Sequence, residues 1–319
     1  MSAQTVSRVS NGLSNVGEQT RDRVLDAMRE LDYRPNTAAR ALRRGSFNTI
    51  GVIMFGFSTV GNLRTLEAVS AAAADAHYLI NVIPVPHPTA HETSLVFARL
   101  NDHPVDGAIV IIESHLLRSA DIEMPAGVPI VIMDSMRRDD LPIVDNDQVL
   151  GARQATTHLL SLGHRTVFHI GGPPASISSA RREESWRRVL EEVGADIPEV
   201  LYGDWTAESG HLRGLELAAR DDVTAIFVAN DQMALGVMRA LHESGKRVPE
   251  DVSVVGFDDI EESANFWPPL TTIRQDFTEI GRRGVTALIS AIHREHHELP
   301  ADPVPTQLIV RSSSAPPPQ

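Results

Sequence analysis

Polar side chains follow several predicted buried strands at the points where those strands end. They come directly after short apolar runs rich in Val and Ile, and they are Asp134, Asn230, Asp231, Asp258 and Asp259. Ligands of open α/β sheets bind in the crevice beyond the carboxyl ends of the strands. Arg182 and Trp205 lie in predicted loops that reach the same crevice. Carboxylates and amides hydrogen-bond hydroxyl groups, and an indole ring can stack on the apolar face of a pyranose. The pattern therefore predicts a site for a hydroxyl-rich ligand.

Strand-end Asp and Asn residues also serve widely as turn and helix-cap residues. For any single Asp, this structural role is the commoner one. Five such residues at strand ends favour a binding site, but the sequence leaves the structural role open for each of them.

Catalytic chemistry finds little support in the sequence. There is no cysteine, which excludes thiol nucleophiles, disulfides and thiolate metal sites. The motifs GxSxG, HExxH and GxxxxGKS/T do not occur. Asp258 and Asp259 could form an acid–base pair, but no nucleophile accompanies them. The segment HREHHE, with His293, His296 and His297, could bind a metal, although an exposed helix end is the simpler interpretation. We predict a binding protein that is not an enzyme and needs no cofactor or metal.

The elements that must position these residues alternate between strands and helices. Apolar, β-branched runs lie at 49–54, 78–84, 106–112, 129–133, 166–171, 224–229 and 252–258. Helical patterns lie between them at 63–77, 152–164, 185–194 and 233–245. Runs buried on both faces and joined by helices are typical of parallel sheets. The sequence predicts an α/β body of two doubly wound parallel-sheet subdomains. The polar, Pro-rich end of the chain, SSSAPPPQ (312–319), is predicted to be disordered.

The N-terminal segment differs from this body in charge. Residues 1–45 carry eight arginines and five acidic residues, whereas the remaining 274 residues carry 21 basic and 37 acidic ones. A basic head on an acidic body is typical of a nucleic-acid-binding arm, although a solvated helical surface would look the same. Ser2 is predicted to cap a helix that ends at Ser10, and a second helix is predicted over 18–31.

Six motifs in a fixed order resemble the lactose/galactose repressor family of transcription factors over nearly the whole chain. They are TVSRVSNG (5–12), TRDRVLDAMRELDYRPNTAARALRRG (20–45), IGVIM (50–54), IVDNDQVLGARQATTHLLSLGHRTVFHIGG (143–172), VANDQMALGVMRALHESGKRVPEDVSVVGFDDIE (228–261) and PPLTTIRQDF (268–277). The resemblance implies a helix-turn-helix head with a hinge helix over residues 1–45, the hinge at about 36–44. It also implies a periplasmic-binding-protein-like core over 46–319. The N-subdomain would comprise about 46–145 and 276–304, and the C-subdomain about 146–275 and 305–312.

The same resemblance implies residues that contact operator DNA. The recognition helix of such a head enters the major groove, and dimers read a pseudo-palindromic operator. Leu42 matches a hinge leucine that wedges into the minor groove. The implied DNA-binding residues are Ala3, Gln4, Ser7, Arg8, Asn11, Asn36, Ala39 and Leu42.

The core is implied to bind a small sugar effector between its subdomains. The implied effector-binding residues are Asp134, Arg182, Trp205, Asn230, Asp258, Gln275 and Phe277. Arg181 is the rival of Arg182, because this loop is one residue shorter than in the family pattern. The wall made by Phe55, Phe57, Thr59 and Asn62 differs from that of lactose-binding members, which leaves the identity of the sugar open.

A homodimer is also implied by the resemblance. The implied interface residues are Leu235, Met238, Arg239 and Phe266, and their alternative place is the core of one chain. No C-terminal heptad leucine helix follows, so we expect a dimer. The family head begins with a helix that has no counterpart before residue 3. We therefore expect a true start upstream of Met1, since without that helix the head would bind DNA weakly.

These observations together predict a sequence-specific transcriptional repressor whose operator affinity is controlled by a small sugar, a galactoside being one candidate. The alternatives are a sugar-binding protein that does not bind DNA and a repressor that responds to a purine. No run of 18 apolar residues and no secretory signal core occur, so we expect a cytoplasmic protein that does not contact membranes.

Overall fold

The computed structural model describes residues 2–10, 15–33, 45–55, 59–85, 89–111, 127–133, 142–295 and 302–318. The chain divides into two compact units, Met1–Phe47 and Asn48–Gln319, which we describe separately. The predicted hinge segment 36–44 lies outside the described residues.

The N-terminal unit contains two short helices, α1 (Ala3–Ser10) and α2 (Glu18–Glu30). The Thr5 amide donates to Ser2 Oγ at 3.2 Å, so Ser2 caps α1 as the sequence predicts. Val9 and Val24 are buried, while Leu25 and Leu31 are exposed. The core of this unit, as far as it is described, is therefore small.

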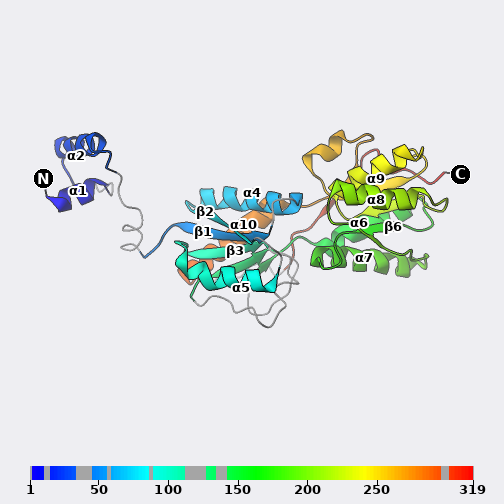
Figure 1. The fold of residues 1–319 in the computed structure, drawn as a ribbon, viewed down its shortest axis with the longest axis horizontal. Helices are drawn as coiled ribbons and strands as arrows, with labels where there is room; N and C mark the ends of the chain where they lie inside the picture. The colour runs from blue at the N-terminus through cyan, green and yellow to red at the C-terminus, as the bar shows by residue number, and fades with distance from the viewer. Residues whose placement is uncertain are drawn as a thin grey trace. The chain divides into compact units, whose positions relative to one another are not determined.

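The first sheet of the larger unit is parallel throughout (Figure 1). Its strands, in spatial order, are β2 (Leu79–Val85), β1 (Thr49–Phe55), β3 (Gly107–Ile111), β4 (Ile130–Met133) and β5 (Ile143–Val144). Helices α4 (Val60–Asp75) and α10 (Phe277–His293) pack on one face, and α5 (Ala90–Arg99) packs on the other. Successive side chains of a strand point to opposite faces, so Val52 and Met54 pack under α4 and α10, and Ile53 packs under α5.

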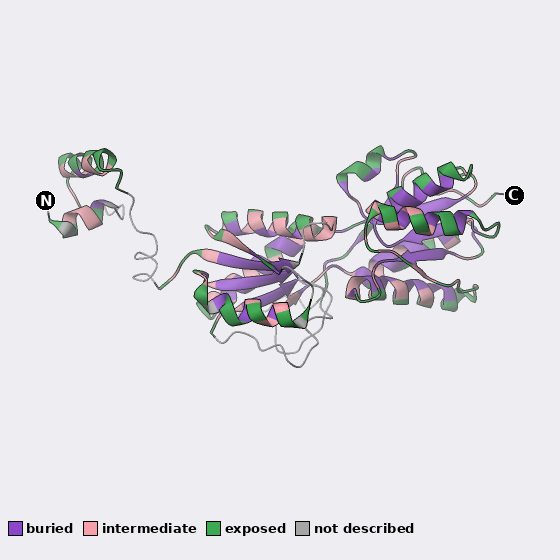
Figure 2. Cartoon of the chain, viewed as in Figure 1, coloured by how far each residue is buried: buried purple, intermediate pink, exposed green. Residues whose placement is uncertain are grey.

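The second sheet is parallel except at one edge. Its order is β11 (Gln307–Ile309), β10 (Thr271–Arg274), β9 (Ser253–Asp258), β8 (Ala225–Val228), β6 (Phe168–Gly171) and β7 (Leu201–Tyr202). Strand β11 runs antiparallel to β10. Helices α6 (Gln148–Ser161) and α7 (Ile177–Val193) cover one face, and α8 (Ala207–Ala218) and α9 (Asp231–Glu243) cover the other. Figure 2 shows buried strands in both sheets and exposed outer sides of the helices.

The chain passes between the two sheets three times: from β5 to α6, from β10 to α10, and from α10 to β11. Side-chain caps fix where the helices begin after the first two passages. Asp147 Oδ1 accepts from the Leu150 amide at 2.8 Å, and Asp276 Oδ1 accepts from the Glu279 amide at 2.9 Å.

The predicted α/β class with two parallel-sheet subdomains is confirmed. All seven predicted strands are present within a few residues. The apolar runs missed four strands: β5 and β7, which are two residues long, β10, whose first residues are threonines, and the three-residue β11. The helical patterns named from the sequence did not include α5, α8 and α10.

The prediction of a disordered C-terminal end is wrong for the described residues 312–318. Ser313 is fully buried: its hydroxyl accepts from the Thr271 amide at 2.7 Å and donates to the Val254 carbonyl at 2.6 Å. The Ala315 carbonyl accepts from Ser253 Oγ at 2.9 Å. The prediction from polar composition failed because Ser313 uses its hydroxyl to bond backbone groups of β9 and β10 instead of facing water.

We predict that Ser313→Ala lowers the free energy of unfolding by about 1–3 kcal/mol, because the buried Thr271 amide loses its acceptor. Urea unfolding measures the change. Ser312→Ala, at an exposed neighbour, is the control and should stay within about 0.5 kcal/mol of the unmodified chain. Equal stability of the two variants would contradict this account of the C-terminal segment.

Candidate functional site

The end of β9 and the start of the turn that follows it carry two adjacent residues with positive φ. Asp258 has φ +114° and Asp259 has φ +52°, and residues with side chains rarely adopt such positive values. Asp258 is buried, and Gln275 Nε2 donates to its Oδ1 at 2.6 Å. The turn thus points a carboxylate inward at the end of a central strand.

Arg182, on α7, supplies the positive charge for this carboxylate. Its Nη2 lies 3.9 Å from Asp258 Oδ1, and its Nε donates to Gln148 Oε1 at 2.8 Å. Nη1 donates to the Ala229 carbonyl. The guanidinium carbon lies 3.7 Å from the centre of the Phe257 ring and 5.6 Å from the Trp205 ring. A cation held by aromatic faces and three polar partners is fixed in one orientation.

Burial raises the pKa of Asp258 to about 6, against the opposing effects of the Arg182 charge and the Gln275 hydrogen bond. The side chain is therefore mainly a carboxylate at neutral pH. It becomes a carboxylic acid when the pH falls below 6.

Three of the other strand-end polar residues form hydrogen bonds or ion pairs with other groups of the chain. Asp231 is fully buried and accepts from the Ile260 amide, Ser263 Oγ and Thr272 Oγ1, and burial raises its pKa to about 7. Asn230 caps α9 through the Met233 amide and donates to the Trp205 carbonyl. Asp259 pairs with two arginines, Arg274 and Arg311. For Asp231 and Asp259 the structural role is therefore the one the contacts support, and Asp134 lies outside the described residues.

A cavity of about 110 Å³ lies between the ends of the two sheets. The first sheet and its helices contribute an apolar wall of Ile111, Met133, Val144 and Ile280, together with Asn62, Thr65 and Asn146. Arg182, Gln275 and Phe277, all expected from the sequence, also line it, as do Gln148 and Ser178.

The sequence reasoning missed Gln148 and Asn146. Gln148 accepts the Arg182 hydrogen bond, and its amide nitrogen lies 3.4 Å from Gln275 Oε1. Asn146 is buried, and its Oδ1 has no hydrogen-bond partner among the described residues. The run Asp145–Gln148, at the end of one strand and the start of a helix, was the available signal.

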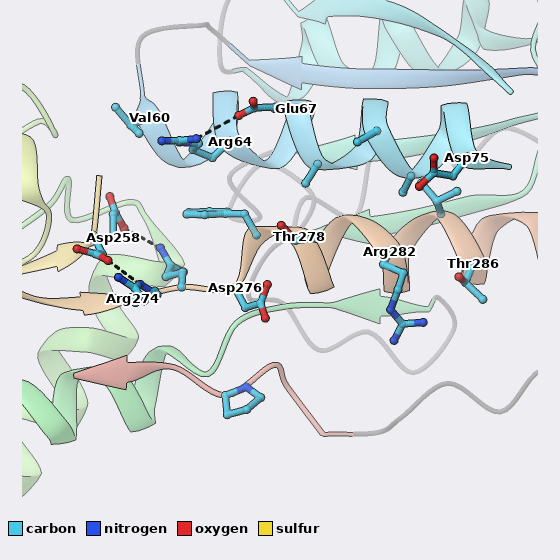
Figure 3. A pocket seen from close by; sticks show the side chains of 18 of the residues that line it. Val60, Arg64, Glu67, Asp75, Asp258, Arg274, Asp276, Thr278, Arg282 and Thr286 are labelled. Carbon is cyan, nitrogen blue, oxygen red and sulfur yellow. Dashed lines mark hydrogen bonds and ion pairs between the residues drawn. The ribbon is translucent and has the colours of Figure 1, made fainter. Parts of the chain in front are cut away.

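A larger groove of about 990 Å³ adjoins this cavity. Figure 3 shows α4 and α10 along its sides, and Asp258 and Arg274 at one end. Gln275 and Phe277 line both the groove and the cavity, so these two side chains stand between them. Trp205 and Asn230 line neither space. The Trp205 ring contacts the Arg182 guanidinium, and Asn230 donates a hydrogen bond to the Trp205 carbonyl.

Arg181, the alternative to Arg182, lies at the rim. Its side chain is 35% exposed, and its Nη1 donates to Asp145 Oδ2 at 3.4 Å. Asp145 also lines the cavity. The buried position in contact with Asp258 belongs to Arg182.

The remaining sequence predictions fall into two groups. Met238 and Phe266 are buried in the chain's own core, while Leu235 and Arg239 are exposed. On α1, Gln4 and Arg8 are exposed and Ser7 is half-buried; Ala3 begins the helix. The following lie outside the described residues: Asn11, Asn36, Ala39, Leu42, Phe57, His296 and His297. Thr59 and Asn62 stand at the start of α4, and of the Phe55 side chain nothing is described.

No helix in the described part of the chain is long and apolar enough to cross a membrane. Within the same residues, no group of three or more His, Asp or Glu side chains could hold a metal ion.

The sequence matches the family model of bacterial regulatory proteins, lacI family, over residues 1–36, and that of a periplasmic binding protein-like domain over residues 156–314. The lactose operon repressor of Escherichia coli (strain K12) is 34% identical over 291 residues, which are 91% of this chain and 81% of the relative. The chain belongs to the lacI family of bacterial regulatory proteins.

Solved structures of lacI-family proteins share the fold. A structure of the lac repressor dimer bound to operator and the anti-inducer ONPF has a TM-score of 0.89 and 31% identity, covering 99% of this chain and 96% of that one. A complex of the transcriptional regulator CelR with cellobiose has a TM-score of 0.74 and 31% identity, covering 98% and 96%. The predicted family is confirmed. Its relatives are named as repressors and transcriptional regulators, as expected, and not as enzymes.

We predict that Arg182→Gln lowers the free energy of unfolding by about 3 kcal/mol at pH 8, because it leaves the Asp258 carboxylate buried without a positive charge. Arg181→Gln removes a longer pair at the rim, in which the arginine is 35% exposed, and should cost less than about 1 kcal/mol. Chemical denaturation of both variants measures the difference. Similar losses from the two substitutions would contradict the assignment of Arg182 to the buried position.

Proposed function

We propose that this lacI-family protein is a dimeric transcriptional repressor whose affinity for a pseudo-palindromic operator is controlled by a small sugar, a galactoside, bound in the cavity between the sheets. The observation that carries the proposal is the buried, interacting set of Asp258, Arg182 and Gln275. Arg182 and Gln275 face an apolar wall across that cavity, and Asp258 lines the adjoining groove. The proposed effector residues are Asp134, Arg182, Trp205, Asn230, Asp258, Gln275 and Phe277. The proposed location is the cytoplasm.

A sugar fits this site because a pyranose has both polar and apolar sides. The Asp258 carboxylate and the Gln148 and Gln275 amides can exchange their mutual hydrogen bonds for bonds to ring hydroxyls. Ile111, Met133 and Phe277 can cover the C–H side of the ring. Asn146, whose buried Oδ1 has no partner among the described residues, offers an acceptor to a further hydroxyl.

The solved relatives support the proposal, since the lac repressor structure contains operator DNA and the CelR complex contains cellobiose. A ligand that touches both sheets favours one relation between the two subdomains over another. If that relation also sets how the heads meet DNA, sugar and operator change each other's affinity by the same factor. The proposed dimer uses the exposed Leu235 and Arg239, whereas Met238 and Phe266, which the sequence also pointed to, are buried in the chain's own core.

A tryptophan-fluorescence titration against galactosides, glucosides, pentoses and purines tests the effector class. One galactoside should give a saturable change that Trp205→Phe removes. Trp267 is 94% exposed, so Trp267→Phe is the matched control and should keep the change. A response to a purine and to no sugar would overturn the proposed effector class.

The affinity for methyl β-D-galactoside should depend on pH through Asp258. The carboxylate accepts two hydroxyl hydrogen bonds, while the protonated acid accepts fewer, so affinity is full above pH 7 and falls as the pH drops through about 6. Between pH 7.5 and pH 5 we expect a loss of about tenfold by calorimetry. Asp258→Asn should bind weakly at both pH values. A flat profile for the unmodified chain would exclude Asp258 as the acceptor.

DNA binding should depend on the exposed side chains of α1. Arg8→Ala and Gln4→Ala should each weaken binding to an operator selected from random sequence by about tenfold, because each removes a base or phosphate contact. Arg29→Ala, at an exposed arginine of α2 that pairs with Asp26, is the control and should change binding by less than about threefold. Fluorescence anisotropy measures both. Equal effects of Arg8→Ala and Arg29→Ala would contradict the placement of α1 on DNA.

A further inference from the structure

The geometry assigns a positioning role to Arg311: we propose that Arg311, together with Arg274, holds the Asp258–Asp259 turn in its strained form and so aims the Asp258 carboxylate into the effector site. The inference rests on the proposed function, because Asp258 is the proposed sugar acceptor. Arg311 itself comes from the C-terminal segment that follows β11 and does not line the cavity.

The first step is the strain in the turn. Asp258 and Asp259 both have positive φ, and Asp258 at +114° lies in a region that residues with a Cβ rarely adopt. Strained conformations of this kind persist only where the surroundings over-determine them. Contacts that hold this turn therefore decide where the Asp258 side chain points.

Two arginines hold one side of the turn. Arg274 Nε donates to Asp259 Oδ2 at 2.6 Å, and Arg311 Nη2 donates to Asp259 Oδ1 at 2.6 Å, so both oxygens of the buried carboxylate are bonded to a cation. Arg274 is half exposed, whereas the Arg311 side chain is only 17% exposed. The contact from Arg311 is thus the better shielded from solvent.

Arg311 is itself fixed at both ends. Its amide donates to Thr271 Oγ1 at 2.9 Å, and its Nη1 donates to the Leu270 carbonyl at 2.7 Å. Both acceptors belong to the start of β10 or the residue before it, and β10 pairs with β9 in parallel. The guanidinium therefore ties the turn at the end of β9 to the neighbouring strand.

Asp231 holds the other side of the same turn. Its fully buried carboxylate accepts from the Ile260 amide at 3.0 Å and from Ser263 Oγ at 2.6 Å. Residues 258–260 are thus held by the hydrogen bond from the Ile260 amide to Asp231 and by the ion pairs of Asp259 with Arg311 and Arg274. Loss of Arg311 leaves the half-exposed Arg274 to hold Asp259 alone.

The test compares Arg311→Gln with two controls that disturb the chain without touching Asp259. Ser313→Ala loosens the same C-terminal segment, and Arg247→Gln removes a chemically matched arginine pair with Asp251. Affinity for methyl β-D-galactoside, and in parallel for cellobiose, is measured by calorimetry. Arg311→Gln should weaken binding of whichever sugar the unmodified chain takes by about tenfold, and each control by less than about twofold. Arg311→Lys keeps the charge but not the forked geometry, and should recover part of the loss.

A second readout needs no ligand. Amide hydrogen exchange of residues 258–263 should speed up about tenfold in Arg311→Gln and stay unchanged in Arg247→Gln, at an exposed arginine, because the Ile260 amide is protected by the held turn. In Ser313→Ala, which lowers the stability of the whole chain, exchange of these residues should speed up no more than that of other core amides. If the unmodified chain binds no sugar, the proposed function fails, and the exchange rates alone still decide whether Arg311 holds the turn. Unchanged exchange in Arg311→Gln, or equal loss of sugar affinity in Ser313→Ala, would overturn the inference.

Discussion

The turn at Asp258–Asp259 is the constraint on which the functional half of this molecule depends. A strained backbone presents one carboxylate to the space between two sheets while its neighbour is anchored by arginines. Three groups hold the two aspartates in these different surroundings. The buried Asp231 accepts from the Ile260 amide, and the Gln275 amide and the Arg182 guanidinium contact the Asp258 carboxylate.

Burying the polar groups around this turn lowers the stability of the fold, because they lose their hydration. Buried ion pairs contribute little net stability, because the cost of removing two charges from water offsets their attraction. Asp258 and Arg182 are each less than a tenth exposed, and Asp231 is fully buried beside them. Their raised carboxyl pKa values reflect that cost. An apolar layer in the same space would be at least as stable. The buried polar arrangement is therefore what we expect where a ligand exchanges hydrogen bonds with it.

Much of the fold could be predicted from sequence because strands buried on both faces leave continuous apolar runs. The strands β3, β4, β8 and β9 follow that rule, and the polar residues at the ends of β8 and β9 marked the site. Short or threonine-containing strands such as β7 and β10 carry no such signal. The sequence also could not predict which strand-end residues face the site and which have a structural role. Asp258 and Asp259 are identical in type and adjacent, and only the backbone angles and the arginines around them separate a carboxylate facing the site from a structural one.

Sequence-distant partners account for the other omissions. Ser313 is buried because β9 and β10 leave an amide and a carbonyl for it, and Gln148 belongs to the site because Arg182 reaches it from α7. Such pairings depend on the three-dimensional packing of elements far apart in the chain, so local composition does not report them.

The most direct test of the account is a crystal structure of the full chain with methyl β-D-galactoside. The account predicts that the Asp258 carboxylate accepts hydrogen bonds from two ring hydroxyls, with the backbone of Asp258 still at positive φ and Asp259 still bonded to Arg311. A sugar bound elsewhere, or an Asp258 side chain that keeps only its bond from Gln275 while the ligand is present, would contradict it.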